Sequence, residues 1–251
     1  MPIKPALPFL AIAAGLAVVI AVGTTAAVTR PASASATTRS PFVRPTFEPA
    51  RPNEAVDLTR RWMLGEREKL DSLSVHTQAC YDALDGAGMR YTHISASRNL
   101  KGCGYNDDAV TIDKSFVKYT APETLVMTCN LAARLELWER EVVAPAAEKH
   151  FGVPLTGVVA FGTFSCRRVN GDGPMSEHAY ARAADIAGFK LADGRTVTVL
   201  KSFRSKGPEG AFLREIHDRA CDVFDVTLGP DFNADHANHF HLDVGGGHSC
   251  H

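Results

Sequence analysis

Two histidines and one aspartate are placed in the chain so that they could bind a single metal ion. His178 and Asp185 lie seven residues apart in a segment that is otherwise mostly small and apolar. Far downstream, the segment from His236 to His241 also contains His239, so it holds three of the ten histidines. Two imidazole nitrogens and one carboxylate oxygen suit a catalytic zinc, with a fourth position left for water. We therefore predict that His178, Asp185 and His241 bind Zn²⁺.

The same histidine cluster supplies a candidate general base. Alternation along a strand places His239 and His241 on one face, so both would point into one cavity. Zinc lowers the pKa of a bound water towards about 7, and His239 could accept the proton that this water loses. Glu177 is the alternative base, but its side chain should point away from His178.

Other polar residues could support this chemistry. Arg167 could stabilise a developing oxyanion or bind a substrate carboxylate; an ordinary salt bridge is its alternative role. His236 lies in a loop from which it could reach the outer contacts of the site. Asp243 could orient a ligand imidazole, with surface hydrogen bonding as the alternative. Ser176 could cap a short helix.

The elements that would position these residues are mixed helices and hairpin-linked strands. Apolar periodicity and turn residues predict helices at 78–84, 122–151 and 208–224, and strands at 90–94, 109–119, 155–164, 186–191, 196–203 and 240–244. This order predicts an α+β fold with a largely antiparallel central sheet flanked by helices. We expect the zinc site in a cleft on that sheet.

The N-terminus is typical of an export signal. Residues 5–29 form an uncharged, largely apolar run between Lys4 and Arg30, and small residues follow at 32–36. The run is also long enough to span a bilayer, so a retained inner-membrane anchor is the alternative to a cleaved signal. The sequence therefore predicts an exported protein of the periplasm or cell envelope.

The remaining chain divides into a lead-in and one domain. After the signal or anchor at 1–36, residues 37–75 would form a proline-rich linker and a charged, solvated helix. Residues 76–251 would form the compact domain. The formal net charge is −1 and no basic stripe is present, which excludes nucleic acid as an expected partner.

All six cysteines lie beyond the apolar run, at positions 80, 103, 129, 166, 221 and 250. An even number of cysteines behind an export signal predicts three disulfides, with free buried thiols as the alternative. The order of the expected elements suggests the pairs Cys80–Cys103, Cys129–Cys166 and Cys221–Cys250.

Several short motifs between residues 76 and 250 resemble the bacterial extensin-like C-terminal domain family. They are Gly102-Cys103-Gly104, Cys129, Phe164-Ser-Cys166-Arg167, Ser176-Glu-His178, Asp185-Ile-Ala-Gly-Phe189, Ala220-Cys221, Leu228-Gly-Pro230 and His236-x-x-His239-Phe-His241-Leu-Asp243.

That family in turn resembles the LAS-type zinc peptidases, which include lysostaphin-type enzymes, D-Ala-D-Ala carboxypeptidases and penicillin-insensitive murein endopeptidases. Their shared pattern is Ser-x-His-x-x-Gly-x-Ala-x-Asp followed by His-x-His. The resemblance implies that His178, Asp185 and His241 are zinc ligands and that His239 is the catalytic histidine. His236 resembles a further histidine of the murein endopeptidases. Arg167 resembles the arginine before the first motif in the carboxypeptidases.

The resemblance implies an exported zinc peptidase, either an endopeptidase or a carboxypeptidase, that hydrolyses stem peptides or cross-links of peptidoglycan. A metal-stabilised domain that binds the cell wall without catalysis is the alternative, and a disulfide-stabilised structural envelope protein is another. Ala181 stands where the peptidase pattern has glycine. Its methyl group could crowd a close backbone approach or oppose a positive φ.

Overall fold

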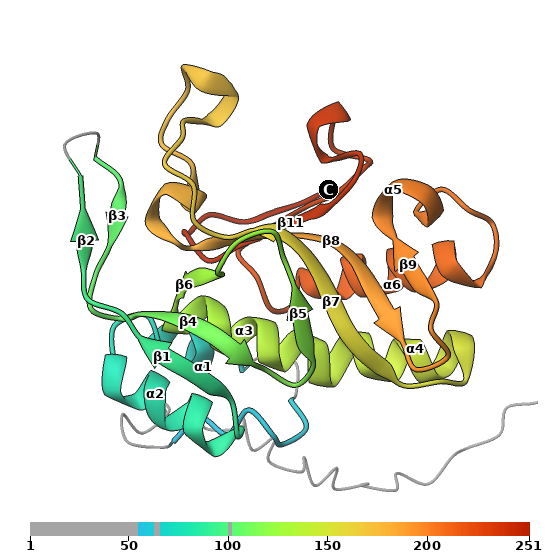
Figure 1. Cartoon of the computed structure of the whole chain (residues 1–251), viewed down its shortest axis with the longest axis horizontal. Coiled ribbons are helices and arrows are strands. Elements are labelled where there is room, and N and C mark those ends of the chain that lie inside the picture. The colour runs from blue at the N-terminus through green and yellow to red at the C-terminus, as the bar shows by residue number, and fades with distance from the viewer. Residues whose placement is uncertain (1–54, 63–65, 100–101) are drawn as a thin grey trace, which may run out of the picture. The chain divides into compact units, whose positions relative to one another are not determined.

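The computed structural model describes residues 55–62, 66–99 and 102–251 (Figure 1). The predicted signal or anchor and the proline-rich part of the linker lie outside these residues. Within the described ranges, no helix combines the length and the apolar composition that crossing a bilayer requires.

A seven-stranded sheet forms the centre of the described chain. Its order is β12-β10-β11-β8-β7-β5, and β9 also pairs with β8. Its strands are β5 (Lys118–Thr120), β7 (Leu155–Gly162), β8 (Ala183–Leu191), β9 (Thr196–Thr198), β10 (Val226–Leu228), β11 (Phe240–Asp243) and β12 (Ser249–Cys250). The β5–β7 and β10–β12 pairs are parallel, and the other pairs of this sheet are antiparallel. The α+β class is therefore confirmed, with a mixed central sheet.

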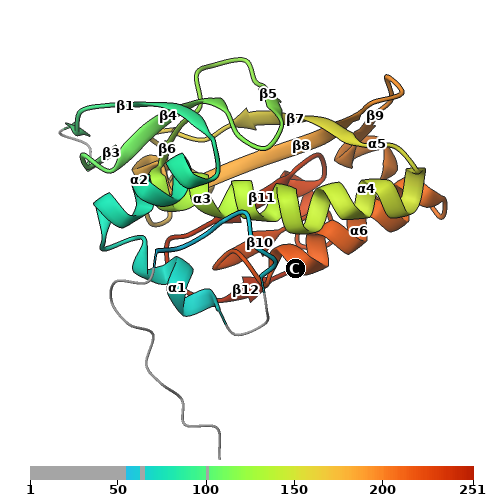
Figure 2. The ribbon, with the colours of Figure 1, turned by 90° about the horizontal axis from the view of Figure 1, so that it is seen from below.

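A long helical segment packs beneath this sheet (Figures 1 and 2). It consists of α3 (Cys129–Trp138), a π-helical turn (Glu139–Val143) and α4 (Ala144–Phe151), and α6 (Pro208–Ala220) packs beside α4. Trp138 contacts Phe189 of β8 at a ring-centroid distance of 5.8 Å, which joins the helix to the sheet. Both side chains are fully buried. Large aromatic rings bury much apolar area, so this contact contributes strongly to the core.

Smaller elements complete the fold at the end of the sheet near β5. A three-stranded sheet has the order β1-β4-β6, and β2 and β3 form a hairpin. These elements and the remaining helices are α1 (Arg67–Ser72), α2 (Thr77–Gly86), β1 (Arg90–His93), β2 (Ser97–Arg98), β3 (Gly104–Tyr105), β4 (Ala109–Lys114), β6 (Val126–Thr128) and α5 (Val199–Ser202).

Several local predictions were wrong. The long helix begins at Cys129 rather than near residue 122, because Thr128 ends β6 and its hydroxyl accepts a hydrogen bond from Leu131 N, as an N-cap does. The strand expected at 196–203 ends at Thr198, where α5 takes over. The strand β12, near the end of the chain, was not predicted; it pairs with β10.

The lead-in before residue 76 is part of the core, so the prediction of a solvated helix was wrong. Leu58, Leu70 and Leu73 are buried in the same apolar cluster as the helices and the central sheet. The helix itself, α1, is short; its buried leucine Leu70 faces the core, and its Arg67 and Asp71 form ion pairs with Asp225 and the buried Arg134.

Three disulfides are present, as predicted, but two of the predicted pairings were wrong. The pairs are Cys80–Cys129, Cys103–Cys166 and Cys221–Cys250. The first joins α2 to α3, which pack against each other although far apart in sequence. The second joins the residue before β3 to the loop after β7. Only the pair that closes the shortest loop, Cys221–Cys250, was predicted correctly.

Candidate metal centre

Two of the three predicted metal ligands lie directly opposite each other on neighbouring strands. In the antiparallel pair β8–β11, Asp185 is in register with His241, and Ile186 is in register with Phe240. Opposed residues share a face of the sheet. Phe240 contacts His217 of α6, so it marks the helix-covered face. Asp185 and His241 therefore project from the opposite face.

An extra residue in β8 makes this arrangement possible. On β7, Val159 and Ala160 are adjacent, yet they pair with Gly188 and Ile186, so Ala187 is unpaired. Such a bulge shifts the alternation of side chains by one position. Phe189 can then reach the helices while Asp185, four residues earlier, points away from them.

His178 comes from a short 3₁₀ helix, Glu177–Tyr180, that precedes β8. The hydroxyl of Ser176 accepts a hydrogen bond from His178 N at 3.4 Å, so the predicted cap is present. Ala181 ends the turn with φ 56° and ψ 30°, the left-handed conformation that glycine adopts most easily. Its carbonyl accepts a hydrogen bond from Thr128 N at 2.8 Å, which holds the turn against the end of β6.

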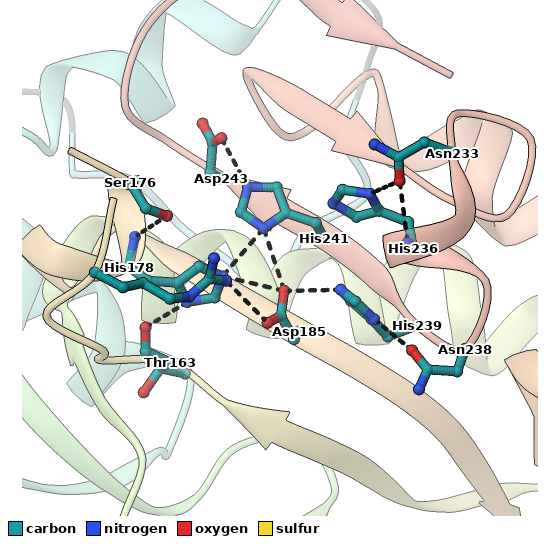
Figure 3. Close-up of polar contacts among 11 residues, drawn as sticks. Thr163, Ser176, His178, Asp185, Asn233, His236, Asn238, His239, His241 and Asp243 are labelled. Atoms are coloured by element: carbon teal, nitrogen blue, oxygen red, sulfur yellow. Dashed lines mark hydrogen bonds and ion pairs between the residues drawn. The ribbon is translucent and has the colours of Figure 1, made fainter. Parts of the chain in front are cut away.

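The donor atoms of these three residues converge on one point (Figure 3). His178 Nε2 lies 3.1 Å from Asp185 Oδ1 and 3.1 Å from His241 Nδ1, and His241 Nδ1 lies 3.2 Å from Asp185 Oδ1. Ligands of a tetrahedral zinc at 2.0–2.2 Å would lie about 3.3 Å apart. The spacing of the three donors therefore fits one small metal ion.

The outer nitrogens of the two imidazoles fix which nitrogen faces the centre. His178 Nδ1 lies 2.7 Å from the carbonyl oxygen of Thr163, and His241 Nε2 lies 3.0 Å from Asp243 Oδ2. Both partners are acceptors, so these nitrogens carry the protons and the inner nitrogens present lone pairs. Two lone pairs and a carboxylate oxygen thus face one another without a hydrogen between them. This arrangement could hold a metal ion, and it has the outer contacts expected of metal-binding histidines.

Contacts within the cluster shift the pKa values of two of its members. Burial would by itself raise the pKa of Asp185, but the contacts with His178, His239 and His241 hold the pKa of this carboxyl group well below its usual range. Burial would lower the pKa of His241, yet its contacts with Asp185 and Asp243 raise it to about 9. A proton on His241 can therefore place a positive charge beside Asp185 and Asp243.

His239 lies beside the cluster, on the same face as His241. Its Nε2 is 3.4 Å from Asp185 Oδ1, and its Nδ1 donates to Asn238 Oδ1 at 2.8 Å. This second contact fixes the ring with Nε2 turned towards the cluster (Figure 3). His239 and His241 therefore both point towards Asp185.

His236 completes the group from a loop. Asn233 Oδ1 accepts hydrogen bonds from His236 Nδ1 at 2.7 Å and from its backbone N at 3.2 Å. The ring of His236 lies 5.2 Å from that of His239 and 5.9 Å from that of His241. Burial, with the neighbouring histidines His239 and His241, lowers the pKa of His236 to about 4, so its ring is neutral at pH 7.

Arg167 lies near Asp185 of the cluster, whereas Glu177 is paired with another residue. One terminal nitrogen of Arg167 lies 4.0 Å from Asp185 Oδ2, and its side chain is half exposed. The guanidinium can therefore turn towards a ligand in solution. Glu177 forms an ion pair with Arg182 at 2.7 Å. It is thus held by Arg182, and burial raises its pKa above the usual value.

Sequence reasoning missed the residues that orient the histidines, apart from Asp243. Asn233 and Asn238 lie within three residues of a histidine of the cluster, and this spacing is a signal that could have identified them. The carbonyl of Thr163 had no such signal, because a backbone acceptor depends on the path of the chain and not on residue type.

A cavity of about 1000 Å³ lies elsewhere, lined by residues of α1, α3 and the β2–β3 hairpin. Four of its charged side chains form two ion pairs with each other: Arg134 with Asp71, and Arg67 with Asp225. None of the three clustered ligands lines it. We place the candidate site at the histidines because unpaired lone pairs converge there.

Comparison with curated proteins gives no match to the chain. Comparison with solved structures gives none either. The family described as extensin-like protein C-terminus matches residues 78–251, which are more than half of the chain and include every residue of the candidate metal centre. The chain therefore belongs to the extensin-like C-terminal family.

Proposed function

We propose that this protein is an exported, zinc-dependent peptidase that hydrolyses peptides of peptidoglycan. The observation that carries the proposal is the convergence of two imidazole lone pairs and one carboxylate oxygen, with His239 beside them. This donor set is that of a catalytic zinc site, which leaves one position open for water. The resemblance of Ser176–Asp185 and His239–His241 to the LAS-type pattern supports the choice of substrate.

Zinc bound by these three residues would supply a Lewis acid and lower the pKa of a water molecule towards about 7. His178 and His241 serve as neutral donors because Thr163 and Asp243 hold the protons on their outer nitrogens. Asp185 supplies the one negative charge among the ligands. The residues of the chain thus set the charge and the orientation of the site before substrate arrives.

His239 is the proton carrier in this proposal. Its Nε2 faces the cluster 3.4 Å from Asp185 Oδ1, and its Nδ1 is fixed by Asn238. It can accept a proton from a water molecule at the cluster and pass that proton to the amine that leaves when the peptide bond breaks. A single imidazole thereby acts first as base and then as acid.

Arg167 binds the negative charge of the substrate. It approaches Asp185 Oδ2, whereas the histidines approach Oδ1, so it lies on another side of the carboxylate. Its half-exposed guanidinium can bind a peptide carboxylate or the developing oxyanion. Both groups are present when a peptide bond of a wall peptide is cleaved.

Two measurements test the proposal. Protein purified without chelators or a histidine tag should contain about one equivalent of zinc, and less than about half an equivalent would count against the metal site. Muropeptides incubated with the protein should give new products by mass spectrometry, and His178→Ala should give none. Identical product profiles for both proteins would exclude the peptidase and leave a metal-stabilised binding domain.

A further inference from the structure

Five aromatic rings form a continuous row along one side of the metal cluster. Neighbouring ring centroids lie 5.8 Å apart for Phe161 and His239, 5.2 Å for His239 and His236, 5.5 Å for His236 and Phe232, and 5.8 Å for Phe232 and His251. All are ordinary distances for aromatic contacts. The row contains the proposed proton carrier, His239, and none of the three metal ligands.

The first ring of the row is directed towards the site by a bulge in β7. Ala160 pairs with Ile186 and Gly162 pairs with the adjacent Asp185, so Phe161 has no partner on β8. A bulged residue leaves the regular alternation, which often turns a side chain towards an active site. Here the ring of Phe161 meets that of His239 edge to face.

The other end of the row is held by the loop before β11. Phe232 N donates to Gly229 O at 3.0 Å, and Gly229 N donates to His251 O at 2.7 Å. Arg204 pairs with Asp231 of the same loop at 2.8 Å. The loop that carries Phe232 is thus tied to two other segments, which position its backbone beside His236 and His251.

Phe161 and Phe232 are partly exposed although their side chains are apolar. Each is 46% exposed, whereas most large apolar side chains of the described residues are buried. A single exposed apolar residue needs no explanation, but apolar rings that continue a row through active-site histidines indicate a binding surface. The Arg167 guanidinium, near the other oxygen of Asp185, adds a positive charge next to that surface.

The position of His239 within the row indicates how a ligand would lie. Phe161 is on one side of it, and His236 and Phe232 are on the other. Each step between rings is longer than one residue of extended peptide, which spans about 3.5 Å. A substrate along the row would therefore extend for about two residues on the Phe161 side of His239 and about three residues on the Phe232 side. A peptidase that removes one terminal residue needs contacts mainly on one side.

We propose that Phe161 and Phe232 are substrate-binding residues that hold an extended, cross-linked wall peptide on both sides of the cleaved bond, so that the enzyme is an endopeptidase. This inference rests on the proposed function, since it identifies the substrate of that same site. Arg167 binds a carboxylate of the peptide, and the rings contact its aliphatic side chains.

The test compares Phe161→Ala and Phe232→Ala with Phe161→Tyr, Phe232→Tyr and the control Leu200→Ala, which removes an exposed apolar side chain from α5. A cross-linked peptide dimer and a single pentapeptide are the substrates. We expect each alanine variant to lose about tenfold in kcat/KM on the dimer, mostly through KM, and much less on the pentapeptide. The tyrosine variants keep the ring and should lose less than the alanine variants, and Leu200→Ala should resemble the wild type.

Binding gives a second readout that does not need catalysis. Calorimetric titration of the metal-stripped protein with the dimer should show weaker binding for both alanine variants than for the wild type. If the wild type binds the dimer but cleaves nothing, the peptidase proposal fails while the binding row stands. If both alanine variants bind and cleave the dimer like the wild type, or if the losses are equal on the pentapeptide, the inference is overturned.

Discussion

Asp185 and His241 face each other across the antiparallel pair β8–β11, with Asp185 Oδ1 3.2 Å from His241 Nδ1. The backbones of these two residues are paired within the central sheet, so the register of the strands fixes the separation of their side chains. His178, from the turn before β8, supplies the third donor. The candidate site is therefore built on two paired strands of the central sheet and completed by the turn that precedes β8.

Loss of the carboxylate behind His241 should weaken metal binding without removing a ligand. Asp243 Oδ2 accepts the Nε2 proton of His241, and losing such an outer contact typically costs about 10–100-fold in metal affinity. Asp243→Ala should show this loss in a zinc competition titration. Asp235→Ala, which removes an exposed carboxylate near His236, is the control and should bind zinc like the wild type. Equal affinities for wild type and Asp243→Ala would contradict the orienting role.

Removal of the imidazole of His239 should separate catalysis from metal binding. General acid–base groups contribute about 10²–10⁴-fold to rate, so His239→Ala should lower kcat by that order. Its zinc content should stay near that of the wild type, because His239 is not among the three convergent donors. Product formation and metal content measured on the same preparation check this. An active His239→Ala would shift the role of base to another residue.

The left-handed conformation of Ala181 predicts an unusual order of tolerance at this position. Ala181 is fully buried with φ 56°, and a β-branched residue is disfavoured there both by backbone conformation and by packing. We expect Ala181→Val to lower the free energy of unfolding by about 3 kcal/mol. Ala181→Gly should stay within about 1 kcal/mol, because relief of backbone strain offsets the lost methyl contacts and the greater freedom of the unfolded chain.

Chemical denaturation of the two variants of Ala181 would check this order. A glycine variant that is far less stable than the wild type would show that the methyl group, and not the backbone conformation, dominates at this position.

Glu139 makes the stability of the fold depend on pH. This carboxyl group is fully buried under the segment after β4, where Ser115 Oγ donates to it at 2.7 Å and Tyr119 also binds it. Burial raises the pKa of Glu139 to about 8. An acid whose folded pKa is raised stabilises the fold fully below its unfolded pKa of about 4.5 and progressively loses this contribution as pH rises through 8.

Glu139→Gln keeps an acceptor for Ser115 but cannot ionise. Its melting temperature should therefore fall less than that of the wild type between pH 5 and pH 9, and the variant should be the more stable of the two at the upper end. Glu148→Gln, on the surface of α4, is a matched control. Parallel pH profiles for the wild type and Glu139→Gln would contradict the assignment.

The sequence predicted the clustered histidines and the aspartate better than the backbone groups that position them. The spacing of His178 and Asp185, with the His-x-His sequence at His239 and His241, was sufficient to identify four residues that lie together. Their chemistry is visible in residue type. The carbonyl of Thr163 and the bulge at Ala187 are properties of the backbone path, and no residue type marks them.

Elements were predicted well where the signal is local, and poorly where it is not. The Pro208–Ala220 helix has a proline at its start and one apolar face, and it was found near its observed bounds. The Cys80–Cys129 pair depends on α2 packing against α3, a contact between distant parts of the chain. The buried lead-in leucines were missed because their partners lie on α3 and elsewhere in the core, so their own helix shows only a thin apolar face.

The three donors differ in how firmly the chain holds them, and this has a kinetic consequence. Asp185 and His241 lie on paired inner strands, whose amides open rarely, whereas His178 lies on a turn that ends in the left-handed Ala181. Local opening should therefore begin at the turn and release His178 first. Entry and exit of a metal ion would follow that route, so the lifetime of a bound ion would depend on the Ser176–Ala181 turn and its affinity on all three donors.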